Sequence, residues 1–494
     1  MTRTRICFYI LLLTPLVVYW QTIFSEFGMR DDYAQMREAR EEPGKIVRFS
    51  ASVGRPLFGA LLESSFAKID EVDNLQWPRL GGVLLLTILG LALWRQLYQS
   101  GWTEIEAAAV GLGVTLLPAA QITVSWAIGW PWALAVLLSL AGFAAIEAEL
   151  ERGGLKRAVA LVGGAMIYGL AGLIYQPDAL FALVPIAAVL LVRSGREPYI
   201  DLRWFTTHVL AMMTGLLGSF LLVKMLFSNG VFHESARMQF ETNPFTKFAW
   251  FLWQPLPNAL ALYSLRDNFN TGAVVFWGSV VGVAALIGYG YRQDVARLGD
   301  AVKKKWLVCL LFVPFAVHAV SLVAAERSIG YRVLYGLSGL VLVMVVYTLR
   351  SLLAAGRIKP VLHYAMLGVM VLTAAIAAHQ NSYLLVAVPQ GHEWEMVRNV
   401  VERLDFSKAP KVYVITPGPD DRSTERMFVD EFGSLTTDSD WAPREMFKAA
   451  LYQRFPGKLP PGVSYTFKSG RDVPDAKAYD LVIDLRKLKE FRGK

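Results

Sequence analysis

The stretch GGVLLLTILGLALWRQLY, residues 81–98, decides the fold class. Arg95 is its one charged residue, and the rest of the run is almost entirely apolar. A helix of about 20 mostly apolar residues crosses the hydrocarbon core of a bilayer. We therefore predict a transmembrane helix at this position.

Similar apolar runs recur on both sides of this stretch, so the sequence predicts a polytopic α-helical membrane protein. About eleven spans are expected, near residues 6–24, 81–98, 105–123, 127–146, 158–175, 178–192, 205–227, 272–290, 306–324, 332–349 and 361–386. The composition agrees, because 54% of the residues are hydrophobic and 18% are charged, against roughly 45–50% and 25% in soluble proteins. The first run resembles a signal peptide. It is long enough to span a bilayer and lacks a clear cleavage site, so we predict that it is the first transmembrane helix.

The basic residues predict the orientation, because Lys and Arg near helix ends are retained in the cytoplasm. With the N-terminus inside, the cytoplasmic loops contain Arg95, Lys156, Arg157, Arg193, Arg196, Arg203, Lys303, Lys304, Lys305, Arg350, Arg357 and Lys359. The short opposite loops hold little positive charge apart from the segment around Arg327 and Arg332. Two long segments, 25–80 and 228–270, then lie outside. The net charge of +8 is spread in these short clusters between apolar runs, so no nucleic-acid partner is predicted.

The last part of the chain has a different character, with dense charge and several Pro and Gly residues. We divide the chain into a transmembrane domain, 1–388, and a small external α/β domain, 389–494. Strands are expected at 411–416, 463–468 and 479–485, and helices at 393–404 and 443–455.

The motif FGMRDDY, residues 27–33, places Asp31 and Asp32 just beyond the first predicted helix. A carboxylate near the low-dielectric interface is disfavoured unless a partner or a role compensates for it. One of the two could act as general base towards an acceptor hydroxyl. The alternative is an acidic cap on the helix that follows, since Asp is favoured at helix N-termini.

Several other polar residues are expected at the same outer boundary. Arg55 and Arg79 could pair with a lipid phosphate through the planar guanidinium, or could anchor interfacial helices to headgroups. Lys224 could add a further positive charge or could extend to the interface. Tyr175 and Asp178 form an outward turn.

His233 and Glu234 form an adjacent acid–base pair or simply a polar loop. The aromatic run after them fits an amphipathic helix on the bilayer and comprises Phe245, Phe248, Trp250, Phe251 and Trp253. No Walker, HExxH or GxSxG pattern occurs in the sequence. The sequence predicts no organic cofactor and no dedicated metal site, and it leaves a divalent cation open.

The order of these features resembles the GT-C superfamily of membrane glycosyltransferases, most closely the bacterial GtrII-type branch. The motifs that carry the resemblance are DDY (31–33), GRPL (54–57), WPRLGG (77–82), LLP (116–118) and ERSIGYRVLYGLSGL (326–340). The resemblance implies a polyprenyl-phosphate-linked sugar as donor and a cell-surface glycan or glycolipid as acceptor, at the outer face of a bacterial inner membrane. It also implies that Asp31 or Asp32 is the catalytic base and that Arg327 or Arg332 holds the donor phosphate.

Two other functions remain open at this point: a flippase for a lipid-linked glycan and a non-catalytic envelope scaffold. A flippase is expected to hold ionisable residues near the bilayer midplane. This chain instead concentrates its charges at the outer edge, which favours the enzyme.

Overall fold

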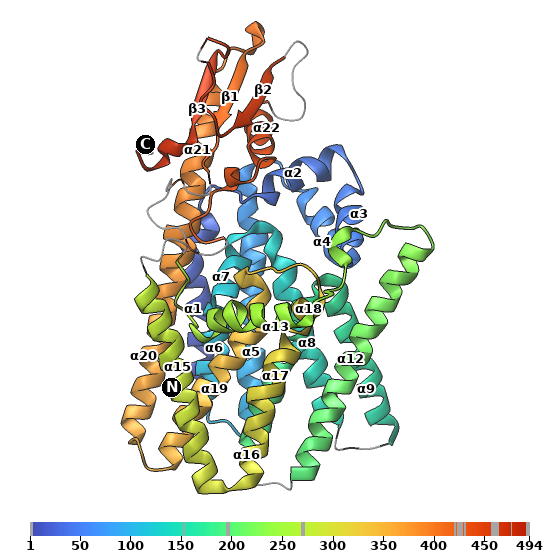
Figure 1. The fold of residues 1–494 in the computed structure, drawn as a ribbon, viewed down its shortest axis with the longest axis vertical. Helices are drawn as coiled ribbons and strands as arrows, with labels where there is room; N and C mark the ends of the chain where they lie inside the picture. The colour runs from blue at the N-terminus through green and yellow to red at the C-terminus, as the bar shows by residue number, and fades with distance from the viewer. Residues whose placement is uncertain are drawn as a thin grey trace.

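The structure, a computed structural model, is a bundle of long helices with a small sheet-containing domain at one end (Figure 1). It describes residues 3–150, 152, 154–193, 198–267, 272–418, 421, 428, 431–455, 464–475 and 477–490. The residue Arg196 of the predicted orientation signal lies outside this set, as does residue 463 of the second expected strand.

Within the described residues, 8 helices are long and apolar enough to cross a membrane. They are built on α1 (Arg3–Phe24), α5 (Gln76–Gln99), α8 (Trp130–Glu149), α9 (Gly154–Ile174), α12 (Pro198–Ser228), α15 (Ala273–Leu298), α19 (Tyr335–Ala354) and α20 (Pro360–Ser382). The predicted fold class, a polytopic helical protein with a small C-terminal domain, is confirmed.

Three of the expected spans are helical but not straight. The segment 105–123 is a pair, α6 (Glu104–Leu116) and α7 (Pro118–Ser125), bent by 49°. Leu117 at the bend is extended, with ψ 152°, because a residue before proline avoids the helical conformation. Counting this pair as one span gives up to 9 spans in the described chain.

The other two are shorter or broken. The segment 178–192 consists of α10 (Gln176–Ala179), η3 (Leu180–Ala182) and α11 (Leu183–Val192). The segment 306–324 is divided among α16 (Asp300–Leu307), the π-turn η5 (Val308–Phe312), α17 (Val313–Val317) and α18 (Ala319–Val323). Pro314 cannot donate a helical hydrogen bond, which accounts for the irregular turn before it.

Short helices cover the bundle on the side of the C-terminal domain. The first long loop forms α2 (Asp31–Glu41), α3 (Lys45–Ser52), α4 (Pro56–Phe66) and η1 (Val72–Leu75), and the second forms η4 (Ala236–Met238), α13 (Pro244–Trp253) and α14 (Pro255–Leu260). Single turns η2 (Ala127–Gly129) and η6 (Tyr331–Leu334) precede α8 and α19. Helix α13 runs across the bundle (Figure 1), with four exposed apolar side chains, Phe245, Phe248, Leu252 and Trp253, whereas Phe251 packs inward.

The chain leaves the bundle through one long helical run. Helix α20 continues through η7 (Tyr383–Ala387) into α21 (Val388–Arg403), which reaches the sheet (Figure 1). The remaining elements are η8 (Phe406–Lys408), β1 (Lys411–Ile415), η9 (Thr436–Asp438), α22 (Ala442–Arg454), β2 (Thr466–Gly470), β3 (Leu481–Asp484) and η10 (Leu485–Glu490). The three strands are parallel, in the order β2-β1-β3.

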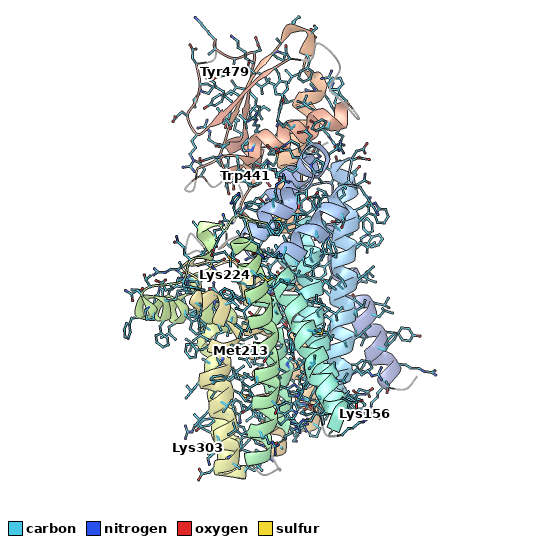
Figure 2. The ribbon with its side chains drawn as sticks, turned by 90° about the vertical axis from the view of Figure 1, so that its right-hand side faces the viewer. Lys156, Met213, Lys224, Lys303, Trp441 and Tyr479 are labelled. Carbon is cyan, nitrogen blue, oxygen red and sulfur yellow. The ribbon has the colours of Figure 1, made fainter. Side chains whose placement is uncertain are left out.

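The first external loop joins the C-terminal domain to the bundle. Arg37 of α2 forms an ion pair with Glu445 of α22 at 2.5 Å, and Tyr33 stacks on Trp394 of α21. Lys156 and Lys303 lie at the opposite end of the molecule from Trp441 and Tyr479 (Figure 2). The predicted orientation requires this separation of basic loops from the C-terminal domain.

Candidate active site

A cavity of about 460 Å³ lies beside the half of α12 that is nearer the C-terminal domain (Figure 2). Its polar lining includes Arg55, Gln176, Arg237, Glu326 and Arg332. Its apolar lining includes side chains of α12, which are Met213, Leu216, Leu217, Phe220 and Val223. The cavity therefore suits a molecule with an anionic head and an apolar chain.

Arg55 is fixed at the start of α4. Gly54 before it has a φ of +79°, a conformation that glycine adopts readily, and Pro56 after it begins the helix. Its Nε donates to Gln176 Oε1 at 3.1 Å, and its guanidinium lies 4.5 Å from the centre of the Tyr175 ring. Burial lowers the pKa of Arg55 below its ordinary value. The side chain thus presents a partly desolvated positive charge to the cavity.

Arg332 lies on the turn η6 and presents a second charge. Its guanidinium is 5.3 Å from the Trp126 ring centre and 5.9 Å from that of Trp132. Its Nη1 also donates to Glu431, a fully buried residue of the C-terminal region. These contacts hold the guanidinium in one place at the cavity wall.

Asp31 lies at the first turn of α2 and is not among the residues that line the cavity. Burial raises the pKa of Asp31 above its ordinary value of 3.8, and the charges of Arg332, Arg30 and Arg237 act in the opposite direction. Among the described residues no group donates a hydrogen bond to the Asp31 carboxylate. The carboxylate is therefore available to accept a proton.

Asp32 is fully buried, and its carboxylate is occupied by backbone groups. Oδ2 accepts from Met29 N at 2.9 Å and from Ala127 N at 3.4 Å, and Oδ1 accepts from Ile128 N at 3.1 Å. Burial raises the pKa of Asp32 to about 7, although Arg79 and these N–H groups favour the charged form. Asp32 thus fastens the loop after α1 to the turn η2.

Arg79 is also buried and turned towards the backbone. Its Nη1 donates to Ser25 O at 3.0 Å, its Nη2 donates to Phe27 O, and its guanidinium lies 3.6 Å from the Phe27 ring centre. It does not line the cavity. The side chain supports the segment that leads from α1 to Asp31.

Of the remaining sequence-predicted residues, Tyr175 shares the cavity with Arg332, and the others do not line it. Arg327 is 47% exposed and contacts Glu241 and Thr246 rather than the cavity. Lys224 pairs with Glu234 at 2.5 Å, and both line a shallow hollow with His233 at the outer end of α12. Tyr175 lines the cavity, and Asp178 is buried one turn further along with no partner for Oδ1 among the described residues.

Three charged residues at or beside the cavity were not predicted: Arg237, Glu326 and Glu431. Arg237 lies on the single turn η4, and Glu326 lies in an extended segment before η6. Neither segment has a periodic pattern of apolar residues from which the direction of its side chains could be predicted. Glu431 is distant in sequence from everything it contacts, so no local pattern could have identified it.

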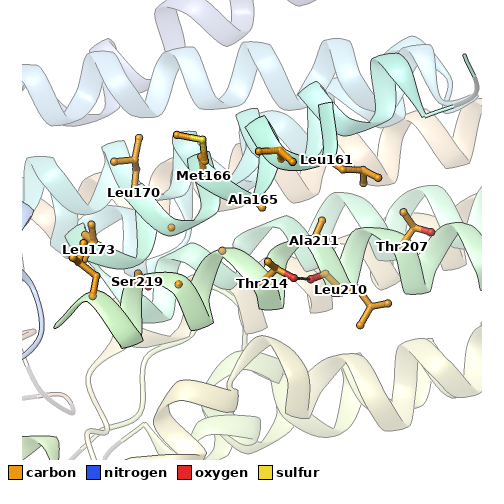
Figure 3. Close-up of a pocket in the computed structure, with 15 residues that line it drawn as sticks. Leu161, Ala165, Met166, Leu170, Leu173, Thr207, Leu210, Ala211, Thr214 and Ser219 are labelled. Atoms are coloured by element: carbon orange, nitrogen blue, oxygen red, sulfur yellow. Dashed lines mark hydrogen bonds between the residues drawn. The ribbon is translucent and has the colours of Figure 1, made fainter. Parts of the chain in front are cut away.

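A second, long groove lies between α9 and α12. It has a volume of about 710 Å³ and shares Ser219 with the cavity. Figure 3 shows its walls, with Leu161, Met166 and Leu170 on one helix and Leu210 on the other. Thr214 Oγ1 donates to Leu210 O of its own helix at 2.8 Å, so this hydroxyl is satisfied without a ligand (Figure 3). The groove is therefore a suitable surface for a hydrocarbon chain.

No group of three or more His, Cys, Asp or Glu side chains in the described parts of the chain is arranged to hold a metal ion. The cavity presents three guanidiniums and one carboxylate, a set that fits a phosphate better than a cation.

Comparison with known proteins gives limited similarity. No protein-family model matches the chain, and no curated protein matches it. Among solved structures, it is similar to the Archaeoglobus fulgidus oligosaccharyltransferase tethered with an acceptor peptide containing the NVT sequon, at 12% sequence identity and a TM-score of 0.43. The alignment covers 95% of this chain and 64% of that one.

Proposed function

We propose that this protein is a glycosyltransferase that moves one sugar from a polyprenyl-phosphate-linked donor to a glycan or glycolipid acceptor. The observation that carries the proposal is one cavity whose lining combines three guanidiniums with apolar side chains of α12. A lipid-linked phosphate stays at the depth of the headgroups, so the groups that serve it must lie at that depth. Transfer then takes place at the outer face of a bacterial inner membrane, with the C-terminal domain outside.

The donor phosphate lies among Arg332, Arg55 and Arg237 in this proposal. Guanidinium groups bind phosphate oxygens through two parallel hydrogen bonds, which fixes the phosphate as well as attracting it. We place the polyprenyl chain along the apolar side chains of α12 and against the groove between α9 and α12. The Tyr175 ring, which already stacks on Arg55, offers an apolar face beside the sugar.

Asp31 acts as the general base. It takes the proton from an acceptor hydroxyl as that oxygen bonds to the anomeric carbon, and the bond from this carbon to the phosphate oxygen breaks. The electron pair leaves with the phosphate, which gains a negative charge. Arg332 and its neighbours stabilise that charge as it develops.

The other predicted residues take supporting roles in the proposal. Asp32 and Arg79 hold the loop that carries Asp31, because both bind its backbone or that of the neighbouring turn. Arg327, Lys224, His233, Glu234 and Asp178 do not reach the phosphate position. We assign them to the walls and to loop contacts on the acceptor side.

The test uses purified protein and a polyprenyl-phosphoryl sugar in detergent. Acceptor-dependent release of polyprenyl phosphate is expected from the wild type and from Asp70→Asn, and a much slower release is expected from Asp31→Asn. Asp70 is the matched control because it is a carboxylate of the same loop that pairs with Arg40 in an exposed position. Transport of intact donor across a vesicle membrane, without cleavage, would instead indicate a flippase.

A further inference from the structure

Glu431 contacts the cavity's central arginine without lining the cavity itself. Arg332 Nη1 donates to Glu431 Oε1, and the Glu431 side chain is fully buried. Its second oxygen, Oε2, has no hydrogen-bond partner among the described residues. A buried carboxylate with an unused oxygen beside a proposed phosphate site calls for an explanation, because such groups are costly when incompletely paired.

The segment that carries Glu431 is fixed on the bundle at several points. Phe432 packs edge-on against Tyr331 with ring centres 5.5 Å apart, and Gly433 N donates to Leu385 O at 2.9 Å. Gln390 Nε2 donates to Ser434 O at 2.7 Å. Glu431 is therefore held in place as a fixed negative charge.

The charge of Glu431 changes what the cavity can bind. Three guanidiniums and one carboxylate line the described cavity, which leaves an excess of two positive charges. Such an excess suits the two charges of a diphosphate. Glu431 neutralises one of the guanidiniums and reduces the excess to one, which suits the single charge of a phosphodiester. The charge of Asp31 is left out of this comparison because it is the same with and without Glu431.

We propose that Glu431 is a specificity-determining residue that makes the site prefer a donor with one phosphate over a donor with a diphosphate. The inference rests on the proposed function, since it concerns the donor of that same site. A fixed negative charge near the ligand disfavours a dianion more than a monoanion, because the repulsion scales with the ligand charge.

The test compares the binding of farnesyl-phosphoryl glucose and farnesyl-diphosphoryl glucose. In Glu431→Gln, the amide keeps an oxygen for Arg332 but removes the charge. The ratio of the two dissociation constants is expected to move about tenfold towards the diphosphate ligand. Glu431→Asp keeps the charge and should retain the wild-type ratio.

Glu445→Gln is the matched control, because Glu445 belongs to the same C-terminal domain and does not line the cavity. Like Glu431, it pairs with an arginine of the bundle side, Arg37 of α2. It should leave the ratio unchanged. An unchanged ratio in a folded Glu431→Gln protein would overturn the inference, as would wild-type protein that binds the diphosphate ligand ten times more tightly. Failure of the wild type to bind either ligand would instead overturn the proposed function.

Discussion

Asp32 accepts a hydrogen bond from the backbone N–H of Ile128 at 3.1 Å, which joins the loop after α1 to the turn before α8. Among the described residues, no such hydrogen bond reaches Asp31, one residue earlier, and the charges of Arg332, Arg30 and Arg237 act on its carboxylate. We therefore propose separable roles for the two adjacent carboxylates, one in positioning and one in chemistry.

Asp32→Ala should destabilise the protein. The substitution leaves buried backbone N–H groups of Met29, Ala127 and Ile128 without their acceptor, and each such loss costs roughly 1–3 kcal/mol. A clear fall in the thermal unfolding temperature is expected in detergent. Asp31→Asn should unfold at the wild-type temperature, and an equal loss in both variants would contradict this division.

The division between Asp31 and Asp32 could not have been made from the sequence. Consecutive residues point in different directions around a helix, and the sequence does not say which direction faces η2. The sequence did predict that both carboxylates lie just beyond the first helix. That much followed from the length of the apolar run before them.

The same reasoning applies to the fold. Apolar run length predicts helices because the bilayer sets it, and every segment expected to span is helical. The bend at Leu117 and the π-turn before Pro314 depend on local backbone geometry that hydropathy does not report. Arg237 and Glu431 reach the site through irregular loops and long-range packing, so no periodicity marks them.

The activity should fall at low pH with the ionisation of Asp31. The base works only when deprotonated, and burial raises its pKa above the ordinary value of 3.8, so the acid limb of kcat/KM should lie above that of an exposed carboxylate. Arg30 lowers this pKa, so Arg30→Gln should move the limb to higher pH. Arg40→Gln, which loses contacts to Asp70, Ile69 and the Tyr452 ring, is the control. A shift to lower pH in Arg30→Gln would contradict the assignment.

Arg332 and Arg327 should differ sharply although both precede the same helix. Arg332→Gln removes a guanidinium from the cavity and should lower kcat/KM about 100-fold or more, the usual cost of losing one group that stabilises a developing negative charge. Arg327→Gln breaks exposed contacts with Glu241 and Thr246 and should change the rate less than about threefold. Steady-state kinetics with one donor measures kcat/KM for both variants, and a similar loss in both would contradict the prediction.

The groove between α9 and α12 can be tested by filling it. A side chain at Gly218 would meet no atom within 4 Å of its first carbon, so Gly218→Leu adds bulk to the groove without a clash at that carbon. Loss of roughly 50 Å² of apolar contact corresponds to about a tenfold rise in KM for a long-chain donor. A donor with a short chain should be unaffected.

Gly282→Leu on α15 is the matched control, because Gly282 is equally open but lies away from the groove. If both variants raise KM alike for both donors, the groove does not hold the polyprenyl chain.

The central claim is that Arg332 holds the donor phosphate while Asp31 removes the acceptor's proton. Donor binding and donor cleavage measured side by side in Asp31→Asn and Arg332→Gln test it most directly. Asp31→Asn is predicted to bind the donor as the wild type does and to cleave it at least about 100-fold more slowly, whereas Arg332→Gln is predicted to bind it about tenfold more weakly. Wild-type cleavage by Asp31→Asn, or wild-type donor binding by Arg332→Gln, would contradict the account.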